Sequence, residues 1–134
     1  MEAKELMIGD WVQHIDGYFL QVGTITDKGL VGCSKEFIGE DYMIRPIPLT
    51  PEILEKNGFV KQNFDGWEYI HPDDSNFSYI DYRILWRTDY DNHLFIKKYK
   101  GGNSSATLQI SCINYIHQLQ HALRLCGINH EIIL

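Results

Sequence analysis

The residues whose types and spacing could best do chemistry are His117 and His121, four positions apart in the segment Ser111–Gly127. On a helix this spacing turns both imidazoles toward one point, as in the H-E-x-x-H motif of zinc proteases. The residues between them are glutamine, leucine and glutamine, so the glutamate that would act as general base is absent. A third metal ligand could come only from His130, Glu131 or more distant histidines. We therefore expect no metal, no cofactor and no catalytic residue here, and keep a metal-dependent enzyme using His117 and His121 as an alternative.

The polar face around this pair has an unusual composition for an exposed helix. Its side chains offer hydrogen bonds with a single permanent charge, whereas a solvated helix more often carries Glu and Lys. It also contains a leucine, and an apolar residue rimmed by polar ones suggests a contact. We expect this face to meet a partner chain or the N-terminal part of the protein. The face also includes Gln120, and the predicted interaction residues are Asn114, His117, Gln118, His121, Arg124 and Leu125.

The helix that must position this face is predicted over residues 112–126. Ser111 can cap its start, with Ile110 and Tyr115 as a hydrophobic staple, and Gly127 provides the stop. Taking 100° per residue, its apolar residues cover about a 120° arc, the width of a core-facing stripe. We expect the cysteines in this stripe to be buried and unreactive. The stripe consists of Cys112, Tyr115, Ile116, Leu119, Ala122, Leu123 and Cys126.

Short strand patterns fill residues 1–48. Runs at Trp11–His14, Tyr18–Thr26 and Leu30–Cys33 are separated by glycine turns, of which Asp16-Gly17 is a strong hairpin signal. The segment then leaves through Pro46-Ile47-Pro48, where two prolines forbid a helix or a central strand. We expect a strand-rich lobe that forms an SH3-like barrel or a curled meander.

Residues 49–134 are predicted to form an α+β lobe, with a single core shared by both lobes as the alternative. A short helix over 51–57 has Thr50 as its cap, Pro51 at its first position and Gly58 as its left-handed stop. Strand patterns follow, among which Phe77–Arg87 alternates between apolar and charged residues. After the helix 112–126, residues 130–134 are predicted as a final strand. The expected fold class is α+β, with an antiparallel sheet packed against the C-terminal amphipathic helix.

The charge balance narrows the classes of partner. The chain has 134 residues, 44% of them hydrophobic, and a net charge of −6, so it can form a core but repels phosphate backbones. Nucleic acid is therefore not the expected partner. A nucleic-acid-binding small barrel remains an alternative, and it would use Trp11, Tyr18, Phe19 and the basic patch Lys97–Lys100.

Neither a membrane nor an oxidising compartment is indicated. The stretch Met1–Asp10 carries acidic residues and lacks the apolar region of a signal peptide. No apolar run approaches the roughly 20 residues that span a bilayer. Cys33, Cys112 and Cys126 have no metal-binding or redox spacing, and sparse cysteines are typical of a reducing compartment. We expect a cytoplasmic location.

Three stretches, Leu6–Val12, Ile47–Phe59 and Ile113–Leu123, together resemble a family of small uncharacterised proteins from Bacteroides-type gut bacteria and their phages or mobile elements. The phrases P-L-T-P-E-I-L and I-H-Q-L-Q-H carry most of this resemblance. It implies a bacterial cytoplasmic setting and a phage-linked role, but no established activity and hence no functional residue. The G-D-W-V opening also resembles SH3-like and KOW-type barrels. The sequence favours a non-catalytic protein-interaction or accessory module, which binds a protein partner or itself.

Overall fold

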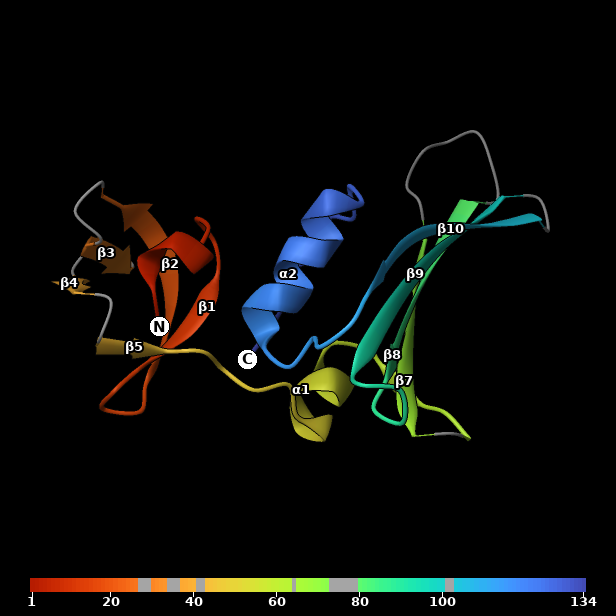
Figure 1. Ribbon diagram of the computed structural model, residues 1–134, viewed down its shortest axis with the longest axis horizontal. Helices are drawn as coiled ribbons and strands as arrows, with labels where there is room; N and C mark the ends of the chain where they lie inside the picture. The colour runs from red at the N-terminus through yellow and green to blue at the C-terminus, as the bar shows by residue number, and fades with distance from the viewer. Residues whose placement is uncertain (27–29, 34–36, 41–42, 64, 73–79, 101–102) are drawn as a thin grey trace. The chain divides into compact units, whose positions relative to one another are not determined.

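The computed structural model describes residues 1–26, 30–33, 37–40, 43–63, 65–72, 80–100 and 103–134. Within these residues the chain forms two five-stranded antiparallel sheets and two α-helices (Figure 1). The predicted α+β class is confirmed. The backbone divides into two compact units, Met1–Pro48 with Tyr115–His121, and Leu49–Asn114 with Ala122–Leu134. The first unit thus takes in a short segment that the sequence prediction had placed in the second lobe.

The sheet of the first unit is a meander whose last strand returns beside the first, in the order β4-β3-β2-β1-β5 (Figure 1). A short 3₁₀ turn, η1 (Ala3–Glu5), precedes it. The inward positions of its strands are apolar, so the curled sheet encloses a small core of Leu6, Val12, Val22, Val31 and Ile44. The sequence predicts an SH3-like barrel or a curled meander here, and the sheet is a curled half-barrel. The strands are β1 (Trp11–His14), β2 (Phe19–Ile25), β3 (Leu30–Cys33), β4 (Phe37–Glu40) and β5 (Ile44–Arg45).

In the second unit, α1 (Pro51–Lys56) begins at the predicted residue and ends one residue before the predicted end at 57. The Thr50 side chain accepts a hydrogen bond from the Ile53 N–H at 3.3 Å, which caps the first turn. At the other end Gly58 adopts a φ of 86°, and the Phe59 N–H bonds back to the Leu54 carbonyl at 2.9 Å. These bonds form a Schellman motif, in which glycine is favoured because it has no Cβ and so adopts the left-handed conformation without a steric penalty.

The sheet of the second unit has the order β10-β9-β8-β7-β6. The alternation predicted within Phe77–Arg87 is confirmed for β8, where Ile84 and Trp86 are buried and Arg83 is exposed. Residues 73–79, which include the predicted start of that strand, lie outside the described residues. The strands are β6 (Val60–Lys61), β7 (Gly66–Pro72), β8 (Ile80–Arg87), β9 (His93–Lys100) and β10 (Asn103–Ile110).

The second helix, α2 (Ile116–Leu125), starts four residues later than predicted. The N–H groups of Cys112 and Ile113 bond instead to the backbone carbonyls of Asp91 and Asn92, and Cys112 has a φ of 60°. This non-helical conformation leaves Cys112 exposed, so its predicted burial in the stripe is wrong, as is the predicted Ser111 cap. The cap and the first residue of the stripe differ from the prediction because the backbone here makes tertiary hydrogen bonds in place of a helical turn.

Other features of α2 agree with its sequence. Its apolar residues Ile116, Leu119, Ala122 and Leu123 are buried, and Gly127 ends it with a φ of 69°. The predicted final strand over 130–134 is wrong, since these residues form no ladder. Ile133 is fixed instead through the Asn57 side chain, which donates to its carbonyl at 2.8 Å and accepts from its N–H at 2.7 Å. No helix among the described residues combines the length and apolar character needed to cross a bilayer.

Candidate functional site

A fully buried carboxylate lies at the start of β1. Asp10 is 0% exposed, and its Oδ2 lies 2.6 Å from Nε2 of His121. The same oxygen accepts the Met7 N–H at 2.7 Å. A buried carboxylate requires such partners because leaving it unpaired would be strongly unfavourable. Asp10 therefore fixes the imidazole of His121 against the loop that precedes β1.

The neighbouring Gln120 binds the same loop through both ends of its amide. Its Oε1 accepts the Trp11 N–H at 2.9 Å, and its Nε2 donates to the Gly9 carbonyl at 3.0 Å. Gln120 is buried, so these bonds form away from bulk water and leave the amide matched to the backbone. Together with the Asp10–His121 contact they form a polar seat, which we define as Gly9–Trp11 with Gln120 and His121.

His117 is the second histidine of the predicted pair and is also buried. Its ring lies edge-on to that of His121, with centroids 5.6 Å apart. Burial lowers its pKa, an effect that the Asp10 and Glu5 carboxylates oppose and His121 reinforces. Its Nδ1 is buried without a hydrogen-bond partner. The arrangement favours a neutral imidazole that fills space rather than one that transfers protons.

Beside His117 the first unit has an open hollow of about 300 Å³. The walls combine apolar and polar groups, and Glu5 provides the carboxylate among them. Gln118 serves a local purpose as well, because its Oε1 accepts the Tyr115 N–H at 3.1 Å and so caps the start of α2. The hollow is lined by Met1, Glu5, Pro46, Tyr115, His117 and Gln118.

The six predicted interaction residues do not form one exposed surface. His117 and His121 lie in the first unit, against the residues described above, and Gln118 is half-buried beside them. Asn114 is engaged with Asn92 in the second unit. The exposed members are Asn114, Arg124 and Leu125, the last with 76% of its surface accessible. Sequence reasoning found the histidines but missed Asp10, the buried partner of His121, which stands 111 positions away.

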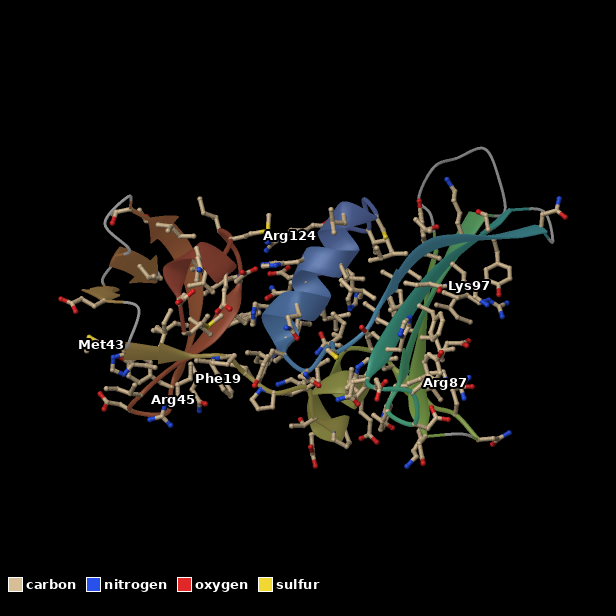
Figure 2. All side chains as sticks on the ribbon, viewed as in Figure 1. Phe19, Met43, Arg45, Arg87, Lys97 and Arg124 are labelled. Atoms are coloured by element: carbon tan, nitrogen blue, oxygen red, sulfur yellow. The ribbon has the colours of Figure 1, made fainter. Side chains whose placement is uncertain are left out.

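A second candidate surface lies on the outer face of β2, β1 and β5. Gln13 is paired with Phe19 on one side and Arg45 on the other, and directly paired residues project from the same face of a sheet. Trp11 and Gln21 form the next pair. We call these residues the hairpin face. Figure 2 shows Phe19 and Arg45 at this part of the sheet, where both are exposed.

The hairpin that carries this face is held by short-range contacts. The buried His14 ring stacks on Tyr18 with centroids 4.6 Å apart, and its Nδ1 lies 3.1 Å from the Asp16 N–H that donates to it. Gly17 takes a φ of 102° at the turn, as the Asp-Gly signal predicts. These contacts order the turn, so the aromatic side chains of the hairpin are presented from a fixed backbone.

These groups do not assemble a reaction centre. The Asp10–His121 pair orients an imidazole, as in hydrolases, but among the described residues it lacks a neighbouring nucleophile and a set of oxyanion donors. No group of three or more His, Cys, Asp or Glu side chains in the described part of the chain could hold a metal ion. The polar seat thus stabilises the first unit internally, whereas Phe19 and Arg45 of the hairpin face are exposed.

Comparison with known proteins adds no family to these observations. No family model, curated protein or solved structure matches this chain.

Proposed function

We propose that this protein is a non-catalytic interaction module whose first unit binds a partner protein through the hairpin face. The observation that carries the proposal is the exposure of Phe19, at 46%, beside Trp11 and Arg45 on one face of a hairpin. Aromatic residues and arginine are enriched at the centres of protein interfaces: aromatic side chains bury large areas with few rotatable bonds, and arginine offers several hydrogen-bond donors. The hairpin face carries one cation, Arg45, and no acidic side chain.

The contacts that Gln120 and His121 make within the first unit also favour this proposal. Because Gln120 and His121 are engaged with the loop before β1, the residues with the most evident chemistry stabilise the first unit. Exposed apolar side chains remain at the hairpin turn, where Ile15 and Tyr18 are 41% and 46% accessible. Together with the resemblance to phage-linked proteins, these features lead us to propose an accessory role in a bacterial cytoplasm.

The proposal can be tested by site-specific photo-crosslinking. A photoreactive phenylalanine analogue replaces Phe19, and the full-length protein is exposed to light in a lysate of its source cell. Tyr90 is the matched control, since it is an aromatic residue of the second unit with 60% exposure. We expect discrete protein adducts at position 19. An excess of unlabelled wild-type protein should suppress these adducts, and an excess of the Phe19→Ser variant should not. Equal adducts at both positions, or none at position 19, would contradict the proposal.

Single-stranded nucleic acid is the competing ligand for this face. Trp11 and Phe19 could stack on bases and Arg45 could contact a phosphate, although the net charge of −6 opposes such binding. Fluorescence anisotropy with a labelled oligonucleotide at low salt separates the two functions. We expect no binding by the wild-type protein. Salt-dependent binding that Phe19→Ser removes would replace the protein partner with nucleic acid.

A further inference from the structure

Among the described residues of the second unit, β10 forms one edge of the sheet. β10 is the last strand in its sheet (Figure 1), and it pairs with β9 along its whole length with one irregularity between Ala106 and Leu108. No other described strand pairs with its outer side. Its sequence, N-S-S-A-T-L-Q-I, contains neither charge nor proline, although proteins commonly use these to block edge pairing. The free N–H and C=O groups of such an edge can accept another strand.

The strand beside this edge is strongly basic. β9 carries Lys97, Lys98 and Lys100 and no acidic residue, in a chain whose net charge is −6; because side chains alternate along a strand, Lys97 and Lys98 lie on opposite faces of the sheet. Lys97 is exposed and lies directly opposite Arg83 on β8, and like charges in this position repel each other. In Figure 2 the Lys97 side chain extends from the sheet. Among the described salt bridges, none involves either cation.

The other face of the same edge is apolar at its Leu108–Ile110 end, whereas toward the start of β10 it carries Ser105, which is paired with Lys98. Leu108 and Ile110 are paired with the buried Ile96 and Leu94, so they extend the core face of the sheet to its margin. Leu108 is half-buried, and Ile110 remains 39% exposed. An added strand would lie about 4.8 Å beyond β10, close enough for its apolar side chains to cover both residues.

We propose that the outer edge of β10 binds an extended segment of a partner protein in which acidic and apolar residues alternate. Strand alternation sends the apolar side chains toward Leu108 and Ile110 and the carboxylates toward the face that carries Lys97. The partner of Lys97 on β10 is Ala106, so a carboxylate at the paired position of the added strand would lie in the same cross-strand row as the lysine. Backbone pairing supplies the affinity, and the charges supply the selectivity.

Two other ligands, a second copy of β10 and a nucleic acid, match this edge less well. A second copy of β10 has no acidic residue with which to neutralise Lys97. A nucleic acid has no peptide backbone with which to continue the ladder. The inference concerns the second unit and is independent of the hairpin face, so Phe19→Ser should leave this binding unchanged.

The test is a titration of the full-length protein with a blocked peptide that alternates glutamate and valine over the length of β10, followed by amide NMR shifts. We expect saturable shifts in β10. The same peptide with lysine in place of glutamate should bind about tenfold more weakly, and the peptide with alternate amides N-methylated should not bind. Equal binding of the acidic and basic peptides, or undiminished binding of the N-methylated one, would overturn the proposal.

A protein variant provides the second arm. Lys97→Glu should weaken binding of the acidic peptide about five- to tenfold, the effect of reversing an exposed cross-strand pair. Lys61→Glu is the matched control, because Lys61 is exposed on β6 at the opposite edge and its reversal changes the net charge equally. Equal weakening by both variants would overturn the proposal, as would association of the unliganded protein with itself through β10.

Discussion

The contact between Asp10 and His121 predicts a large and local loss of stability when either residue is removed. Asp10→Ala deletes the acceptor of two hydrogen bonds, one from the Met7 N–H and one with the imidazole. Hydrogen bonds to charged groups contribute about 1.5–3 kcal/mol each. Because Asp10 is fully buried and the variant leaves both partners behind, we expect a loss of about 3–4 kcal/mol in the first unit.

His121→Ala should cost less, about 2 kcal/mol, because Asp10 retains the Met7 N–H and the His121 side chain is 26% exposed and therefore partly screened. The two changes should not be additive. We expect the double variant to be less destabilised than the sum by about 1–2 kcal/mol, which is the coupling energy of residues in direct contact.

Native-state hydrogen exchange can localise the effect, since it reports the opening free energy of individual amides. The Val12 and Val22 amides report the first unit, and the Ile84 amide reports the second. Asp16→Ala is the matched control, because its side chain is 73% exposed and lies 3.4 Å from a histidine nitrogen, so we expect a loss below about 1 kcal/mol. If Asp10→Ala lowers Val12 protection no more than Asp16→Ala does, the polar seat does not stabilise the first unit.

Three further changes test separate parts of the account. Gln120→Ala should destabilise the first unit by about 2 kcal/mol, since it removes two buried hydrogen bonds to the backbone; a denaturant midpoint unchanged from wild type would contradict this. Gly58→Ala should lower the stability more than Gly127→Ala, although both glycines end a helix at positive φ. The reason is that a Cβ at Gly58 would lie 3.1 Å from the Tyr69 ring, whereas one at Gly127 would meet nothing within 4 Å. Equal melting temperatures of the two variants would refute this steric reason. Burial lowers the pKa of His117 below its ordinary value of 6.5. The contribution of the neutral imidazole to the free energy of unfolding is therefore complete above pH 6.5. It is lost as the pH falls through the lower pKa of the folded state, because the unfolded chain binds the proton more readily. His117→Gln should therefore flatten the acid side of a stability profile, and an unchanged slope would count against a buried neutral imidazole.

Local sequence signals predicted those elements whose ends depend on local bonds. The helix α1 was predicted to within one residue at both ends because Thr50 and Gly58 satisfy its terminal backbone groups within a few residues. The start of α2 was not, because Asp91 and Asn92 bind the backbone of Cys112 and Ile113 from a distant turn. A cap motif competes with such tertiary bonds, and sequence alone does not reveal which wins.

The candidate site shows the same division between local and long-range information. The sequence indicated a polar helix face with two histidines and the turn of the hairpin, both of which depend on short-range spacing. The pairing of His121 with Asp10 spans 111 positions and depends on the folded sheet. An aspartate directly before a predicted strand was the available signal, and it was equally consistent with an ordinary turn.

The most direct measurement of the central claim compares two exposed residues as anchors for a partner. Once crosslinking has identified the protein bound at position 19, its affinity is measured for Phe19→Ser and Leu125→Ser. Phe19 lies on the hairpin face, whereas Leu125 lies on the helix face that the sequence first suggested. The account predicts a loss of at least about tenfold for Phe19→Ser, as expected of an aromatic anchor, and unchanged affinity for Leu125→Ser. The reverse pattern would contradict it.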